Sequence, residues 1–166
     1  MKSLLILGAG GFGQMVKETA LELGYEKVVF LDDAAKEEDV IGKCCDYRIC
    51  HENYSVAVAA FGNNKTRLCW TDKLLEEGYE VPAIIHSSAV VSPSAILEAG
   101  SFIMQRAVVN ANTKVERAAL INSGAVVDHD SVIGAGAHVG LGSVVKAHCT
   151  IEAGGRVEAG EVIFST

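Results

Sequence analysis

The fold of this chain is decided by the segment 121–139, which reads INSGAVVDHDSVIGAGAHV. An aliphatic residue recurs at every sixth position in it, and the same series runs without a gap from Ile85 to Ile163. Four residues after each of these positions the side chain is small, until Glu161 breaks that column. A period of six matches neither the helix (about 3.6) nor the amphipathic strand (about 2). It indicates a hexapeptide parallel β-helix, with aliphatic residues inside the prism and small residues at its corners.

Length, composition and charge limit the class of protein. A chain of 166 residues with 49% hydrophobic residues can bury a substantial core. No run reaches the roughly 18 uncharged apolar residues of a membrane span. The apolar start, 1–7, runs directly into a glycine loop, which predicts the first strand of a cytoplasmic protein. A net charge of −7 argues against nucleic-acid binding, which needs a basic face.

The cysteines indicate reduced thiols and no metal site. There are five, an odd number, and they lack the spacing of a disulfide framework. Cys44, Cys45, Cys50 and His51 lie close together, but they do not form the paired C-x-x-C pattern of structural zinc sites. We therefore expect no metal there.

The first half of the chain reads as a βαβαβ domain. Apolar runs predict strands at 3–8, 27–31 and 55–61, and helical periodicity predicts helices at 13–23 and 65–77, each followed by a glycine. The charged segment 34–53 predicts a loop with at most one short strand. The domain boundary is expected near Pro82, giving a Rossmann-like domain over 1–82 and a β-helix over 83–166.

The loop between the first strand and the first helix carries a phosphate-binding pattern. Residues 8–13 match G-x-G-x-x-G, and Asp32 and Asp33 end the next strand. Glycines allow a phosphate to approach the backbone, and carboxylates at that place accept hydrogen bonds from a ribose or a base. A dehydrogenase needs a larger sheet, so we expect a nucleotide other than NAD. The alternative is that the glycines only make a tight turn.

Three histidines occupy outward positions of the predicted β-helix. His129 is flanked by two acids, and a neighbouring carboxylate can hold an imidazole in one tautomer and increase its basicity. His129 is therefore a candidate general base. His138 lies nine residues further on, half of an 18-residue coil, so the two need not share a face within one protomer. For His148 a solvated surface residue is the preferred interpretation.

Taken together, six motifs resemble those of the NeuD/PglD family of bacterial sugar acetyltransferases, and the resemblance covers nearly the whole chain. They are residues 8–13, 30–33, 60–67, 85–89, 121–130 and 138–139. The resemblance implies a left-handed parallel β-helix, a homotrimer with the active site between protomers, and no metal. It implies acetyl-CoA as the donor and a nucleotide-linked amino-deoxy sugar, with UDP expected, as the acceptor of an acetyl group on its amine.

The resemblance also assigns roles to individual residues. His129 would be the catalytic base, and Asp130 would increase its basicity. His138 would contact the acetyl end of the coenzyme, Asn122 would line the same cleft, and Ala159 would lie near the coenzyme. The residues expected to contact the nucleotide-sugar are Gly10, Gly11, Phe12, Asp32, Asp33 and Gly62.

The chain departs from the family pattern in three places. Phe12 replaces a more usual polar residue in the glycine loop, and Leu141 replaces the proline common after the second histidine. The sequence ends at Thr166 without the family's final coils. This predicts that part of the coenzyme's usual binding surface is missing.

Three other functions stay open at this point. One is O-acetylation of a sialic acid, where the same base would serve a hydroxyl group. A second is a carbonic-anhydrase-like zinc enzyme, which the spacing of nine and ten residues between the histidines fits poorly. The third is a nucleotide-sugar-binding protein without catalytic activity.

Overall fold

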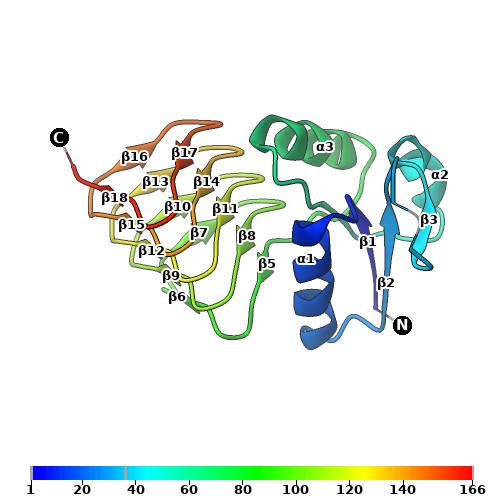
Figure 1. The fold of residues 1–166 in the computed structure, drawn as a ribbon, viewed down its shortest axis with the longest axis horizontal. Helices are drawn as coiled ribbons and strands as arrows, with labels where there is room; N and C mark the ends of the chain where they lie inside the picture. Colours follow the sequence, from blue (N-terminus) through cyan, green and yellow to red (C-terminus); the bar gives the residue numbers. More distant parts are fainter. Residues whose placement is uncertain (1, 36, 166) are drawn as a thin grey trace. The chain divides into compact units, whose positions relative to one another are not determined.

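The computed structural model describes residues 2–35 and 37–165. The chain divides into two compact units, Met1–Pro82 and Ala83–Thr166. The first contains a mixed arrangement of strands and helices, and the second is a stack of short strands (Figure 1). In the described part of the chain, no helix has the length and apolar character needed to cross a bilayer.

A parallel four-stranded sheet with strand order β3-β2-β1-β4 forms the first unit. Its strands are β1 (Ser3–Leu7), β2 (Lys27–Leu31), β3 (Val40–Gly42) and β4 (Ala57–Ala59). Its helices are α1 (Gly11–Glu22), η1 (Cys44–Asp46), α2 (Tyr47–Cys50) and α3 (Asn64–Glu76). Strand β4 and all but the first residues of β1 and β2 are buried because their residues are apolar on both faces, as is usual for parallel sheets, whereas the edge strand β3 is partly exposed.

The main elements agree with the expected ones, with shifts at their ends. Helix α1 begins two residues early because Gly10 is extended and its carbonyl accepts the first helical bond, from Gln14 N at 3.0 Å. Strand β4 is shorter than 55–61 because only Ala57–Ala59 pair with β1. The short elements η1 and α2 were not expected in 34–53. They begin where the Asp46 carboxylate accepts Lys43 N at 2.8 Å, and this local hydrogen bond favours a helical turn over an irregular loop.

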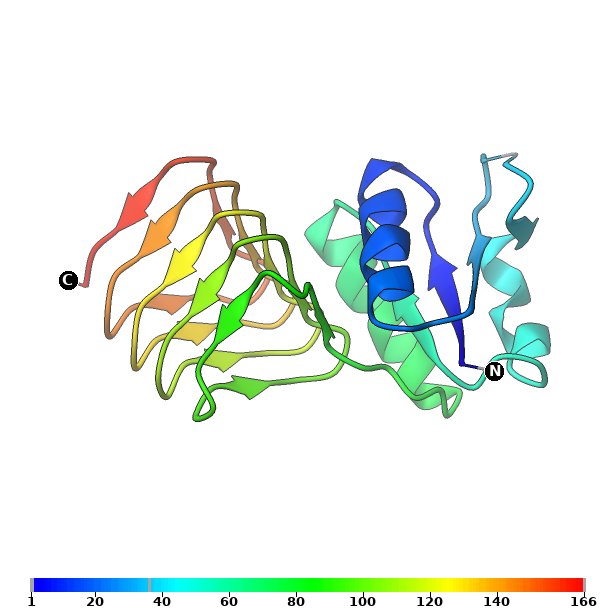
Figure 2. The same ribbon diagram turned by 90° about the horizontal axis from the view of Figure 1, so that it is seen from below.

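The second unit is a parallel β-helix of two-residue strands (Figure 2). Three parallel sheets run along it, with orders β16-β13-β10-β7, β17-β14-β11-β8-β5 and β18-β15-β12-β9-β6. Paired residues are 18 apart, as in Lys114 with Val132. The strands are β5 (Ile84–Ile85), β6 (Val90–Val91), β7 (Ile96–Leu97), β8 (Phe102–Ile103), β9 (Val108–Val109), β10 (Lys114–Val115), β11 (Leu120–Ile121), β12 (Val126–Val127), β13 (Val132–Ile133), β14 (His138–Val139), β15 (Val144–Val145), β16 (Thr150–Ile151), β17 (Arg156–Val157) and β18 (Val162–Ile163).

The six-residue aliphatic column is the interior of this prism. From Ile103 to Val157 every member is buried, together with small residues such as Ala107 and Ala125. Ile85, Val91, Leu97 and Ile163 pack against this core and are partly buried, because they lie in the end coils. The expected hexapeptide β-helix is confirmed.

The turns of the prism repeat a left-handed backbone conformation. Every sixth residue from Gly100 to Gly160 has a positive φ, and five of these positions carry a side chain. A residue other than glycine is strained in this conformation, although Asn, Asp and His tolerate it better than most. The five are Arg106, Asn112, Ala118, Asp130 and His148. Asp130, a predicted site residue, and His148 therefore occupy positions that favour glycine.

One face of the prism carries an apolar row. In the sheet β18-β15-β12-β9-β6, each strand ends in an inward aliphatic residue and begins with valine. These valines lie opposite one another in the strand register, and the two outermost are 64% (Val90) and 44% (Val162) exposed. The row consists of Val90, Val108, Val126, Val144 and Val162.

Candidate active site

The first unit places its glycine loop at the carboxyl edge of the sheet. In the order β3-β2-β1-β4, strands β2 and β3 lie on one side of β1 and β4 lies on the other. The loops after β1 and β4 therefore meet at the point where the strand order reverses, which is where open α/β sheets bind ligands. A Cβ on Gly8 would lie 3.0 Å from Ala60 O, so these two loops are in contact. Gly10, Gly11 and Gly62 are exposed, with no heavy atom within 4 Å of the Cβ position.

Asp32 holds this loop in place. Its Oδ2 accepts Ala9 N at 2.8 Å, and its Oδ1 accepts Ala34 N and Ala35 N at 2.8 and 2.9 Å. The hydrogen bond from Ala9 is the main reason that the pKa of Asp32 lies below its ordinary value. Asp33 is exposed, and its Oδ1 accepts Cys44 N at 3.0 Å. Asp32 therefore orders the glycine loop, a role that the motif did not reveal.

A buried arginine orders the loop after β4. Arg67 is fully buried, and its Nη1 donates to Phe61 O at 2.9 Å while Nη2 donates to Asn64 Oδ1 at 3.1 Å. Burial lowers the pKa of Arg67 to about 10. Asn63 caps α3 by accepting Thr66 N at 2.9 Å. Gly62 is thus held between two anchored residues, while Phe12 lies in the first turn of α1.

In the second unit, His129 and Asp130 form a hydrogen-bonded pair. They lie in the turn after β12, and His129 Nδ1 is 2.7 Å from Asp130 Oδ2. Both side chains are substantially exposed, at 48% and 40%. The pKa of Asp130 is lowered, first by the hydrogen bond with His129 and then by that with Asn112. Because the carboxylate fixes the proton on Nδ1, Nε2 is left as the proton acceptor.

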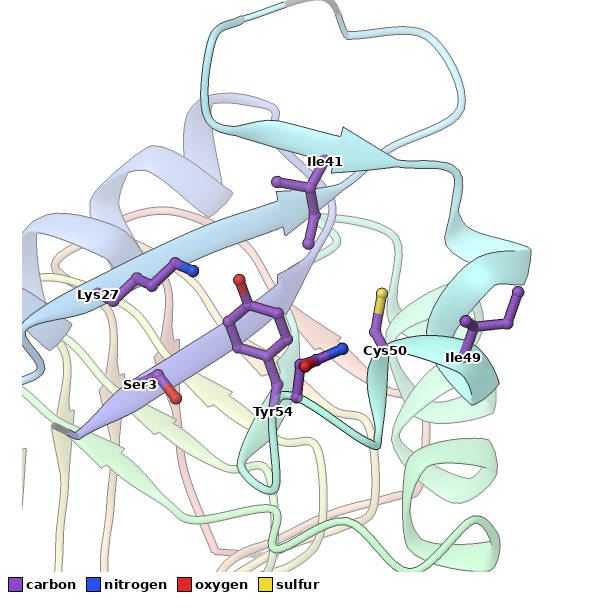
Figure 3. Close-up of a pocket in the computed structure, with 7 residues that line it drawn as sticks. Ser3, Lys27, Ile41, Ile49, Cys50 and Tyr54 are labelled. Atoms are coloured by element: carbon purple, nitrogen blue, oxygen red, sulfur yellow. The ribbon is translucent and has the colours of Figure 1, made fainter.

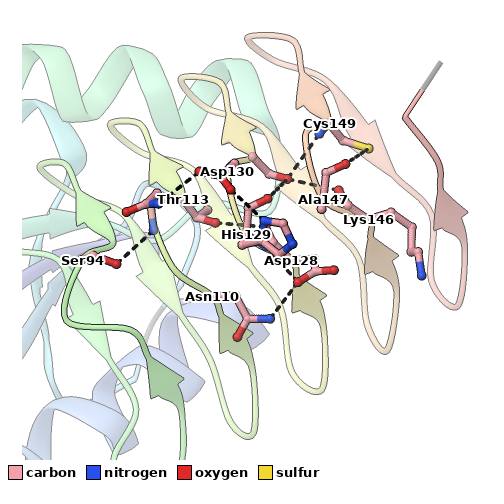
Figure 4. Close-up of polar contacts among 11 residues, drawn as sticks. Ser94, Asn110, Thr113, Asp128, His129, Asp130, Lys146, Ala147 and Cys149 are labelled. Carbon is pink, nitrogen blue, oxygen red and sulfur yellow. Dashed lines mark hydrogen bonds and ion pairs between the residues drawn. The ribbon is translucent and has the colours of Figure 1, made fainter.

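Side chains one coil away orient this turn (Figure 4). Asn112 Nδ2 donates to Asp130 Oδ1 at 3.1 Å, and Asn110 Nδ2 donates to Asp128 Oδ1 at 3.0 Å. Asp128 Oδ1 also accepts His129 N at 2.9 Å, which is the main cause of its lowered pKa. The pair therefore lies on a ladder of amide and carboxylate groups that repeats with the coil.

His148 is exposed, as expected, but it is not isolated. Its ring meets that of His129 edge-to-face, with centroids 5.2 Å apart and planes at 90°. His148 is one coil beyond Asp130, and His148 N donates to His129 O at 3.2 Å. The sequence signal was a separation of 18 residues from Asp130. The separations of nine and ten residues between successive histidines do not indicate this contact.

His138 lies in a strand of a different sheet from β12, the strand that precedes the turn with His129. It is buried in β14, and its Nε2 is 3.1 Å from Asn122 Nδ2. The structure thus brings together the two residues expected to line the coenzyme cleft. Ala159 is exposed one coil after Leu141, itself 51% exposed. Within one protomer, the expected coenzyme residues are not on the turn that carries His129.

A cavity of about 510 Å³ in the first unit contains none of the predicted site residues (Figure 3). It is lined by Ser3, Lys27, Ile41, Ile49, Cys50, Asn53 and Tyr54. Ser3 and Lys27 begin their strands, so the cavity lies away from the carboxyl edge where the glycine loop is. Elsewhere in this unit, Cys44 is buried at the carboxyl end of β2 and donates to Leu31 O, and burial raises its pKa to about 12. That thiol is a packed core group.

Comparison with known proteins agrees with this geometry. Residues 3–74 match the family model of the PglD N-terminal domain. The acetyltransferase domain of PglB from Neisseria gonorrhoeae, solved in complex with acetyl coenzyme A, is 31% identical, with a TM-score of 0.88. That match covers 98% of this chain and 92% of the PglB chain.

A second solved structure is PerB from Caulobacter crescentus, in complex with CoA and GDP-perosamine. It is 30% identical, with a TM-score of 0.86, and the match covers 99% of this chain and 89% of PerB. Identity at this level over nearly the full length of both relatives agrees with the six motifs found in the sequence. The chain therefore belongs to the NeuD/PglD family of sugar acetyltransferases.

Proposed function

We propose that this acetyltransferase transfers the acetyl group of acetyl-CoA to the amino group of a nucleotide-linked amino-deoxy sugar. The observation that carries the proposal is the pair His129–Asp130, with Nδ1 and Oδ2 2.7 Å apart on an exposed turn. The relatives support both substrates, since PglB holds acetyl coenzyme A and PerB holds CoA with GDP-perosamine.

The pair supplies general base catalysis. The neutral amine attacks the thioester carbonyl carbon, and His129 Nε2 takes the amine proton as the C–N bond forms. Collapse of the tetrahedral intermediate breaks the C–S bond and releases CoA, whose sulfur recovers a proton. Asp130 keeps Nδ1 protonated and stabilises the imidazolium that results. Base catalysis of this type contributes roughly 10²–10⁴-fold.

The first unit binds the nucleotide part of the acceptor. Gly10, Gly11 and Gly62 leave open backbone at the switch point, and the start of α1 offers N–H groups to phosphate oxygens. Asp32 also orders the loop through Ala9 N, and we assign Asp32, Asp33 and Phe12 to contacts with the nucleotide-sugar as well. This assignment predicts that nucleotide-sugars, and not NAD, raise the melting temperature of the protein.

The donor is held by a second group of residues. We assign His138 to the acetyl end of the coenzyme and Ala159 to its neighbourhood, while Asn122 would line the same cleft on the side of the sugar. Because His129 lies in the turn after β12 and His138 lies in β14 of another sheet, we expect the complete site to combine residues from two protomers. We therefore propose a homotrimer, whose formation would cover the row of outward valines from Val90 to Val162. Light scattering at micromolar concentration tests this, and a monomer would contradict it.

One experiment separates the proposed reaction from its alternatives. Acetyl-CoA is offered with amino sugars linked to UDP or GDP and with a sialic acid, and both free CoA and the acetylated product are measured. An N-acetylated nucleotide-sugar is the expected product, with UDP as the expected nucleotide and GDP, which PerB holds, as its rival. Acetylation of the sialic acid alone favours the O-acetyltransferase. Binding without CoA release favours a non-catalytic protein.

A further inference from the structure

Three potential metal ligands converge at the turn that carries the base. His129, Asp130 and His148 each place one donor atom within 4.8 Å of the others. Among the described residues, a search for three or more histidine, cysteine, aspartate or glutamate side chains close enough to share an ion finds this group. Two of the three lie 18 residues apart, so one turn of the β-helix brings them together.

The donor set suits a zinc-type dication. Two imidazoles and a carboxylate are ligands that zinc accepts, with bonds of about 2.0–2.2 Å, and the remaining position of a tetrahedral site is left to water. Ligand atoms in such a site are roughly 3.3 Å apart. All three side chains are exposed, so small rotations suffice to close the gap from 4.8 Å.

The backbone beneath these ligands is fixed. Asp130 N donates to Ala111 O at 2.9 Å, and His148 N donates to His129 O at 3.2 Å. Asn112 donates to the other oxygen of the Asp130 carboxylate, which orients that group in the manner of the outer partners of known metal ligands. Little backbone entropy is therefore lost when an ion binds.

We propose that His129, Asp130 and His148 bind a zinc-type dication, and that this ion blocks the catalytic base. A neutral imidazole has one nitrogen lone pair, and coordination uses it, so His129 cannot then accept the proton of the attacking amine. The binding site stands on geometry alone. The blockade rests on the proposed function of His129.

Binding is tested on the full chain after removal of metal by a chelator. Zn²⁺ is titrated against a chromophoric chelator, and Co²⁺ is used as a spectroscopic probe of the ligands. One equivalent is expected to bind, and the Co²⁺ spectrum should lack the intense near-ultraviolet bands of thiolate ligands. His148→Gly removes one imidazole and suits the positive φ, and should weaken binding at least about tenfold.

Arg106→Gly is the matched control, because it makes the same backbone change at another left-handed position. It should leave the affinity unchanged. Equal affinity in the His148→Gly variant, a thiolate spectrum, or no binding at about 100 µM Zn²⁺ would each overturn the site.

The blockade is tested by inhibition, with each variant compared with its own metal-free rate. Zn²⁺ should inhibit the unaltered protein at the concentration that fills the site, and the inhibiting concentration should rise about tenfold or more in His148→Gly. Full turnover with the site filled overturns the blockade. A protein without acetyl transfer refutes the proposed function instead, since the Zn²⁺ titration still reports whether the site binds.

Discussion

The two units of this protein obtain defined positions for polar groups in opposite ways. In the first unit, single hydrogen bonds fix these positions, such as those from Ala9 N to Asp32 and from Arg67 to Phe61 O. In the second unit a repeat of six residues builds every coil alike, and the exposed pair His129–Asp130 is an exception on its outer surface. We conclude that changes in the first unit act mainly through its fold, and changes on the outside of the second mainly through its chemistry.

The largest effect is expected at Gly13 in the first unit. A Cβ there would lie 2.0 Å from Gly8 O, a backbone atom that cannot move without displacing the loop. Gly13→Ala should lower the free energy of unfolding by about 4 kcal/mol and abolish nucleotide-sugar binding. Denaturant unfolding followed by circular dichroism measures this. Gly10→Ala is the control, because its Cβ meets nothing within 4 Å; similar midpoints for the two variants would refute the explanation.

The second prediction tests the opposite behaviour in the β-helix. His129→Ala should lower turnover by about 100-fold or more while leaving the thermal midpoint and the affinity for the nucleotide-sugar unchanged. The reason is that His129 is exposed and contributes no core packing. His86→Ala, which removes another histidine of the second unit, should keep most of the activity. Near-full turnover of the His129→Ala variant, under conditions where chemistry limits the rate, would show that His129 is not the catalytic base.

A smaller effect is expected from Asp130→Asn. Turnover should fall roughly tenfold, the equivalent of about 1.4 kcal/mol in the barrier. The lowered pKa of Asp130 keeps it anionic through the neutral range, and an anion favours the protonated imidazole. Without that anion the imidazolium that forms in the reaction loses a stabilising partner. Steady-state kinetics measure the loss, and turnover equal to that of the unaltered protein would contradict the pairing.

The smallest prediction concerns the left-handed turns. His148→Gly should raise the free energy of unfolding by about 1 kcal/mol or less, because glycine adopts a φ of 60° without strain. Gly142→Ala, in the same column with a φ of 62° and nothing near its Cβ, should change stability in the opposite direction. Equal signs in calorimetry would show that the turn conformation does not control these positions.

The two units also differ in how far their sequences could be interpreted. The β-helix followed from a single period, because each of its residues repeats the environment of the residue 18 positions earlier. The first unit followed from its glycine loop and apolar strands. The helices at Cys44–Cys50 were missed, because they depend on a local carboxylate contact that leaves no periodic pattern.

The sites show the same contrast. His129 and Asp130 are adjacent in sequence, so their pairing could be anticipated, and Asn122 and His138 do lie together. Their catalytic and coenzyme-binding roles stay predictions. The contact of His148 with His129 joins successive coils, and the sequence shows it only when the 18-residue length of a coil is applied to every polar residue. The anchoring of the first-unit loops by Asp32 and Arg67 depends on single hydrogen bonds that leave no periodic pattern in the sequence.

The stacking of Asn112, Asp130 and His148 has a consequence for insertions and deletions. These residues coincide because the chain makes one circuit of the prism between them. Deleting a single residue between Asp130 and His148 would rotate the second imidazole away from the turn and place inward side chains outward. Duplicating a complete coil beyond His148 would leave the group untouched. In the β-helix, the number of residues between two side chains therefore decides whether they can act together, in addition to the identity of those side chains.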